Sequence, residues 1–120
     1  ALSAAGFDVC GVEPNGRMRA RLLLRGVKCL QRIEEVFLDD YDMILCIDVL
    51  EHLQDPGWLL NALTSLSGVG TILVEHTPTW DLSDPLHPVD NYGWLVRDHI
   101  GPRWRSVLEA NGIGVWQKLG

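Results

Sequence analysis

The sequence predicts an α/β domain in which helices flank a mostly parallel sheet. Apolar segments of strand length alternate with segments of helix length along the chain, and this alternation is typical of parallel sheets built from strand–helix–strand units. One segment, MILCIDV at 43–49, is apolar at every position except Asp48. Such a run is typical of a strand that is buried on both faces beneath helices.

The first part of the chain contains short apolar runs separated by helix caps. Asn15 is a good residue to start a helix, and Gly6 and Gly26 are good residues to end one. The chain starts without Met and, in our interpretation, inside a helix, so we expect that its start is missing. The predicted elements are a helix at 1–5, a strand at 7–12, a helix at 16–25, a strand at 27–30, a loop or helical turn at 31–40 and the strand at 43–49.

The second part of the chain begins with a clear helix start. Asp55 is a good N-cap residue, and Pro56 suits the first helical position. Prolines recur in the segment 77–92, which we interpret as a long loop, and loops of this length are usually functional or mobile. The predicted elements are a helix from 55 or 56 to 67, a strand at 71–74, the loop at 77–92, a largely helical segment at 94–110 that Gly101–Pro102 interrupts and Asn111–Gly112 ends, and a strand at 113–119.

Length and composition fit one globular domain. The chain has 120 residues, of which 47% are hydrophobic, so we expect a single domain over residues 1–120. No apolar run approaches the ~20 residues of a membrane span, and the N-terminal segment lacks the basic region and apolar core of a signal peptide. A net charge of −6 argues against a nucleic-acid partner. We expect no membrane partner either.

The three cysteines, Cys10, Cys29 and Cys46, are odd in number and lack the spacing of a metal site. Each lies in a predicted strand. We therefore interpret them as small core residues of a reduced, cytoplasmic protein.

Polar side chains follow the predicted strands where a functional site is expected. Ligands of open α/β sheets bind beyond the carboxyl ends of the strands. Glu13 and Pro14 follow the strand at 7–12, and Asp48, Glu51 and His52 lie at the end of the strand at 43–49 or just after it.

Three segments of the chain carry a family resemblance, in order: GFDVCGVEPN at 6–15, YDMILCIDVLEHLQDP at 41–56 and GTILVEHTPT at 70–79. They resemble the second, fourth and fifth strands of the class I S-adenosylmethionine-dependent methyltransferases, and the chain is most similar to the ubiquinone-biosynthesis-type and related small-molecule enzymes. The resemblance covers most of the chain as far as Thr79. It implies a Rossmann-like fold and S-adenosylmethionine as the cofactor.

The resemblance also implies positions for the cofactor. Glu13 would accept hydrogen bonds from both ribose hydroxyls, because a diol offers two donors to one carboxylate. Asp48 would pair with the amino group of the cofactor or cap the turn that follows. The other implied pocket residues are Pro14 beside the adenine or ribose, Leu30 and Gln31 near the adenine, and Ile47 and Val49 near the methionine part.

Glu51 and His52 have three interpretations. They hold the turn together by hydrogen bonds, or His52 is catalytic and takes a proton from an acceptor hydroxyl as it is methylated. In the third, Asp48, Glu51, His52 and His87 bind a divalent metal, which resembles the small-RNA 3′-end 2′-O-methyltransferases. Asp48 stands where that family has Glu, and the segment HPVDNYGWL at 87–95 matches loosely, so we assign no metal ligand. Of the other histidines, His76 is expected to end a strand and His99 to lie on a helix surface.

The first strand of the family and its Gly-rich loop, of the kind GxGxG, have no counterpart in this sequence. The expected fold is therefore truncated at the N-terminus, with the strand at 7–12 paired directly with the strand at 43–49. We expect the apolar surface left by the missing piece to favour a homodimer.

The resulting prediction is the C-terminal part of a methyltransferase catalytic domain that acts on a small-molecule acceptor. The acceptor pocket would be formed by the loop at 77–92, with Trp80, Tyr92 and Trp94 as apolar walls. Because the Gly-rich loop is lacking, the sequence leaves open whether the chain is an enzyme. The alternatives are a non-catalytic remnant that acts through protein contacts, a metal-dependent RNA 2′-O-methyltransferase, and a nucleotide-binding module for another ligand.

Overall fold

The computed structural model describes residues 2, 4–77, 85–86, 88 and 93–120. The chain forms two compact units, Ala1–Phe37 and Leu38–Gly120, each with its own sheet. Two α-helices and six strands give a mixed α/β architecture in the described part of the chain, so the predicted α/β class is confirmed. The sheet was predicted to be mostly parallel, but two of the three strand pairs in the unit at 38–120 are antiparallel. None of the helices there is long and apolar enough to cross a membrane.

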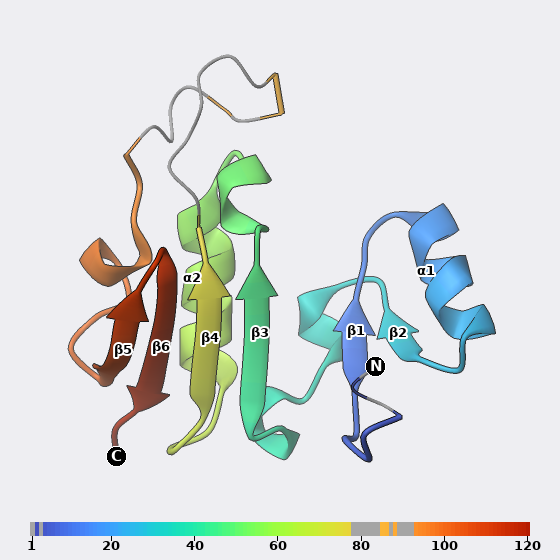
Figure 1. Ribbon diagram of the computed structural model, residues 1–120, viewed down its shortest axis with the longest axis horizontal. Coiled ribbons are helices and arrows are strands. Elements are labelled where there is room, and N and C mark those ends of the chain that lie inside the picture. Colours follow the sequence, from blue (N-terminus) through green and yellow to red (C-terminus); the bar gives the residue numbers. More distant parts are fainter. Residues whose placement is uncertain (1, 3, 78–84, 87, 89–92) are drawn as a thin grey trace. The chain divides into compact units, whose positions relative to one another are not determined.

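The unit at 1–37 is one parallel strand–helix–strand motif (Figure 1). Its elements are β1 (Cys10–Val12), α1 (Gly16–Leu24) and β2 (Lys28–Leu30). The predicted cap is confirmed, because the Asn15 side chain accepts hydrogen bonds from the backbone N–H groups of Arg17 and Met18 at 3.0 and 3.2 Å. After the helix the chain turns at Gly26, whose φ of +77° favours glycine.

The unit at 38–120 is a four-stranded sheet with the order β3-β4-β6-β5 (Figure 1). The pair β3–β4 is parallel, whereas β4–β6 and β5–β6 are antiparallel. Its elements are β3 (Met43–Ile47), α2 (Pro56–Leu66), β4 (Ile72–His76), β5 (Trp104–Ala110) and β6 (Ile113–Lys118). Short 3₁₀ turns occur at Ile33–Glu35, Leu38–Asp40, Leu50–His52 and Val96–Asp98.

Helix α2 covers one face of this sheet (Figure 1). Asp55 caps the helix as predicted, since its carboxylate accepts from the Trp58 N–H at 3.0 Å. The helix buries Leu60 and Leu63, and the sheet buries Cys46, Leu73 and Trp116.

The prediction that segment 43–49 is buried on both faces is wrong. Successive side chains of a strand point to opposite faces, and Met43, Leu45 and Ile47 are 55%, 51% and 46% exposed, whereas Cys46 is buried. Among the described residues of the unit at 38–120, helix α2 covers the face to which Cys46 belongs. An apolar run in the sequence therefore does not show that two helical layers are present.

The predicted pairing of the segment at 7–12 with the segment at 43–49 would join strands of the two different units, and it stays a prediction. Within the units, β1 pairs with β2 and β3 pairs with β4.

The predicted helix at 94–110 is a 3₁₀ turn followed by strand β5. A two-residue turn, Asn111–Gly112, joins β5 to β6, with φ values of +55° and +78°. Two positive φ values at an Asn-Gly turn are typical of a tight β-hairpin. The dipeptide marks a hairpin here and not the end of a helix.

Several predictions fall partly or wholly on residues outside the description. They concern the helix at 1–5, of which the described residues lie in turns, and most of the loop at 77–92, including Trp80, His87 and Tyr92. The cysteines are free, with Cys29 and Cys46 buried and Cys10 half-buried.

Candidate functional site

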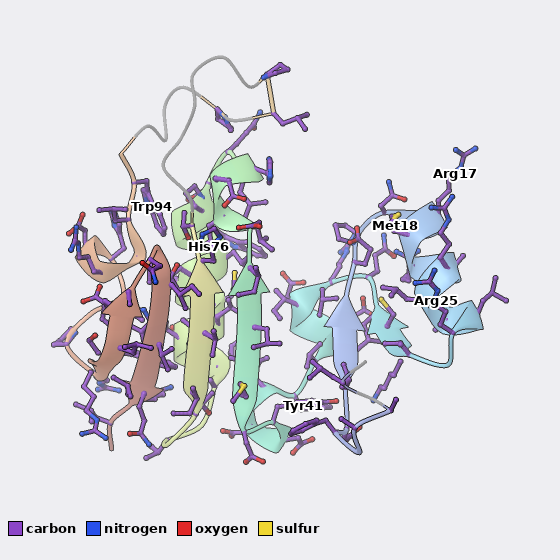
Figure 2. The ribbon with its side chains drawn as sticks, in the orientation of Figure 1. Arg17, Met18, Arg25, Tyr41, His76 and Trp94 are labelled. Atoms are coloured by element: carbon purple, nitrogen blue, oxygen red, sulfur yellow. The ribbon has the colours of Figure 1, made fainter. Side chains whose placement is uncertain are left out.

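Asp48 and His76 meet at the carboxyl ends of β3 and β4. The Asp48 N–H donates to the His76 carbonyl at 2.9 Å, and the Asp48 carboxylate is hydrogen-bonded to Nδ1 of the His76 ring. Figure 2 labels His76 at this end of β4. Asp48 has a φ of +56°, a conformation that Asp adopts more readily than most residues. The pair fixes the His76 ring from one side.

The structure places Val49 and Ile47 beside this pair, both partly exposed. The Asp48 carboxylate is 55% exposed, so it remains accessible to a ligand while it contacts His76. Asp48 is therefore not a cap for the turn that follows. That turn is held by its backbone, through the bonds His52 N–H to Val49 and Leu53 N–H to Leu50 at 3.1 and 3.2 Å.

Glu51 is buried at the same end of the sheet, with only 1% of its surface exposed. Neither carboxylate oxygen accepts a hydrogen bond within the described residues. Nε2 of the His52 ring lies 3.3 Å from Oε1, without hydrogen-bond geometry. The interpretation that Glu51 holds the turn by hydrogen bonds is therefore wrong.

The His52 ring is 40% exposed. Its Nδ1 lies 3.4 Å from the Leu86 carbonyl, and its Nε2 faces Glu51. Both ring nitrogens thus lie near oxygen atoms.

In the described part of the chain, no group of three or more His, Cys, Asp or Glu side chains is arranged to hold a metal ion. Asp48, Glu51 and His52 therefore do not form such a group. His87, the fourth residue of the metal interpretation, lies outside the described residues.

Glu13, in the unit at 1–37, lies where β1 and β2 end. Its backbone N–H donates to the Leu30 carbonyl at 2.9 Å, which places Glu13 beside the start of the segment that contains Gln31. Its Oε1 accepts from the Asn15 N–H at 2.9 Å, and Arg19 donates to the Glu13 and Pro14 carbonyls at 2.9 and 3.3 Å. One carboxylate oxygen is thus fixed by the helix cap. These contacts hold the exposed Pro14 in place as well.

A row of side chains on the helix-covered face of the sheet was not predicted. The register pairs Cys46 with Glu75, Glu75 with Gly114, and Gly114 with Glu109. Glu75 is only 8% exposed, and its Oε2 accepts from the Thr77 hydroxyl at 3.0 Å. The sequence signal was a charged residue inside the apolar run TILVEH, which has no simple place in a buried strand.

Burial raises the pKa of Glu75, against the lowering effects of Thr77, Trp116 and His76, and Glu109 raises it further. Burial, followed by the charges of Glu75 and Glu51, raises the pKa of the Cys46 thiol to about 12. Cys46 therefore stays a neutral thiol at physiological pH and is not a nucleophile.

A cavity of about 300 Å³ opens beside this row, between the end of β4, the 3₁₀ turn Val96–Asp98 and the β5–β6 hairpin. Apolar side chains supply part of its wall. Trp94, predicted as a wall of the acceptor pocket, stacks on His99 with ring centroids 4.5 Å apart. His99 lies just after the 3₁₀ turn and is exposed, not on the predicted helix. The lining includes Glu75, Thr77, Val96, Arg97, Glu109 and Gly114.

A family model described as a methyltransferase domain matches residues 1–117. The chain belongs to this methyltransferase family. No curated protein matches it. The match confirms the resemblance to the class I S-adenosylmethionine-dependent methyltransferases and extends it beyond Thr79 to nearly the whole chain.

The candidate site residues of this methyltransferase domain lie at two strand ends, one in each unit. The unit at 1–37 brings together Glu13, Pro14 and Gln31. The unit at 38–120 brings together Asp48, Val49, Glu51 and His52, and adds His76 and Glu75, whose roles the sequence did not indicate. Asp48 contacts His76 because β3 pairs with β4, and the sequence alone does not show that contact.

Proposed function

We propose that this methyltransferase domain binds S-adenosylmethionine and transfers its methyl group to a small-molecule acceptor. The observation that carries the proposal is Glu13, a carboxylate fixed at the common end of two parallel strands in a chain of this family. When bound, the cofactor supplies a sulfonium methyl group that a nucleophile can attack directly.

Each unit offers, at its own strand end, residues that suit one part of the cofactor. Glu13 has one oxygen on the Asn15 N–H and can accept ribose hydroxyls with its remaining capacity, since a carboxylate has about four acceptor sites. Pro14 and Gln31 would lie beside the adenine. Asp48 and Val49 would hold the methionine part, with the exposed Asp48 carboxylate available to an amino group.

A proton acceptor is needed when the attacking group is a hydroxyl or an ammonium. His52 is the candidate from the sequence, and His76 is a second one. The geometry favours His76, because Asp48 occupies its Nδ1 and a carboxylate on one ring nitrogen orients the other as a base. The main contribution of the protein is to align the reacting groups and to exclude water.

Titration with S-adenosylhomocysteine, followed by calorimetry, tests the cofactor site. We expect micromolar binding that falls about tenfold or more in Glu13→Ala, because a charge-assisted hydrogen bond is lost. The control is Glu34→Ala, since Glu34 is exposed in the same unit. An absence of heat at millimolar ligand would refute binding by this chain and favour a non-catalytic role through protein contacts.

The proton acceptor is tested by the rate of S-adenosylhomocysteine formation with a metabolite extract as the acceptor source. Our expectation is a larger loss in His76→Gln than in His52→Gln. A loss only in His52→Gln would assign the role to His52, and an equal loss in both variants would contradict the preference for His76.

A further inference from the structure

Arg19 differs in its surroundings from three neighbouring arginines, which are all exposed: Arg17, Arg21 and Arg25. Arg19 is half-buried, and its guanidinium reaches back past the start of α1. There its Nη1 donates to the carbonyls of Glu13 and Pro14 at 2.9 and 3.3 Å. The side chain therefore joins the helix to the connection between β1 and α1, in which Glu13 lies.

The position of Arg19 does not favour the helix itself. The residue is close to the N-terminal end of α1, where the helix dipole is positive and a cation is unfavourable. No acidic residue lies in the first turn of α1 to offset the charge. Both carbonyls that accept from Arg19 belong to residues outside the helix, and a charged donor makes hydrogen bonds that are about twice as strong as neutral ones. The contacts of Arg19 therefore stabilise the connection that precedes the helix.

Pro14 makes this connection depend on its carbonyl groups. A proline has no N–H group, so the Pro14 carbonyl is the only backbone group of this residue that can form a hydrogen bond. On the side of the strand, the Glu13 N–H is already held by the Leu30 carbonyl at 2.9 Å. Because Arg19 holds the carbonyls of both Glu13 and Pro14, it fixes the peptide planes before and after the proline.

We propose that Arg19 is a positioning residue for the cofactor site of this methyltransferase. By fixing the two peptide planes, it sets the direction in which the Glu13 side chain leaves the backbone, so that the carboxylate faces the ribose of S-adenosylmethionine. Two hydroxyls can bond to one carboxylate only when distances and angles suit both of them. Arg19 itself touches no part of the cofactor in this role. The inference rests on the proposed function, in which Glu13 accepts the ribose hydroxyls.

Calorimetric titration with two ligands isolates this role. The ligands are S-adenosylhomocysteine and its 2′-deoxy analogue, which lacks one of the two ribose hydroxyls. We expect the wild-type chain to bind S-adenosylhomocysteine about tenfold more tightly than the analogue, because the analogue loses a hydrogen bond to a carboxylate. In Arg19→Met, binding should weaken about tenfold for S-adenosylhomocysteine and about twofold for the analogue, so that the preference falls to about twofold.

The matched control is Arg21→Met, the same change at an exposed position of the same helix, which should leave both affinities unchanged. Methionine and arginine have similar helix propensities, so we expect Arg19→Met to fold. If it does not, Arg19→Lys keeps the charge on a shorter side chain and should lower the preference to an intermediate value. An unchanged preference in the variant that folds would refute the positioning role. An equal loss for both ligands would show that Arg19 only stabilises the unit, which would also overturn the proposal.

The inference and the proposed function fail in different ways. No binding of either ligand by the wild-type chain would refute cofactor binding and the role of Arg19 with it. Equal affinities of the wild-type chain for the two ligands would leave cofactor binding in place and remove Glu13 and Arg19 from recognition of the ribose.

Discussion

Replacing Lys118 should lower the stability of the protein, because its side chain makes two hydrogen bonds to one end of helix α2. Its ammonium donates to the carbonyl of Thr64 at 2.7 Å and to that of Ser67 at 2.5 Å. Both carbonyls are at the C-terminal end of α2, where backbone acceptors lack helical partners and the helix dipole is negative. The last strand thus caps the helix that covers the sheet.

The change Lys118→Met keeps the aliphatic stem and removes the charged donor. Each hydrogen bond from a charged group contributes about 1.5 kcal/mol or more, and two bonds at a partly buried site give an expected loss of roughly 2–3 kcal/mol in the free energy of unfolding. The free energy of unfolding of a small domain is only about 5–15 kcal/mol in total.

Urea unfolding measures this loss, with fluorescence of the buried Trp104 and Trp116 as the signal. With a slope of about 1.5 kcal/mol/M, the midpoint should fall by about 1.5 M. The matched control is Arg103→Met, because Arg103 is exposed and should change stability by less than about 0.5 kcal/mol. A loss in Lys118→Met no larger than in this control would show that water satisfies the carbonyls equally well.

Two further predictions concern the buried carboxylates. Glu51→Leu should raise the free energy of unfolding by about 1–3 kcal/mol in urea unfolding, because it replaces a buried, unpartnered carboxylate by an apolar group; a loss of stability would reveal a partner for Glu51. Burial raises the pKa of Glu75 above its ordinary 4.5, so the folded state keeps this proton where the unfolded state releases it. Stability should therefore fall as pH rises from about 4.5 through the raised pKa, and Glu75→Gln should remove this part of the decline; identical pH profiles in the two proteins would contradict it.

Local signals in the sequence predicted the elements that depend on neighbouring residues. Asn15 and Asp55 cap the two helices as expected, and the polar ends of β1 and β3 are where the candidate residues lie. Caps act within a few positions of the chain, which is why sequence alone identifies them.

Contacts between distant segments were not predictable in this way. Glu75 and Glu109 share a row only because β6 lies between their strands, and no local pattern states that order. The hairpin at Asn111–Gly112 carried a local signal that we interpreted as a helix end, since the residues before it, LEA, are good helix formers. Pairing with β6 overrides that propensity.

The position of β6 between β4 and β5 also affects how the chain folds during synthesis. β5 pairs only with β6 among the described strands, and β6 leaves the ribosome after β3, β4 and β5. Until Ile113–Lys118 has emerged, β4 has an open edge and α2 lacks its lysine cap. An open edge beside apolar strands is a site for wrong pairing, so the nascent unit at 38–120 should need protection, by the ribosome surface or a chaperone, until β6 has emerged.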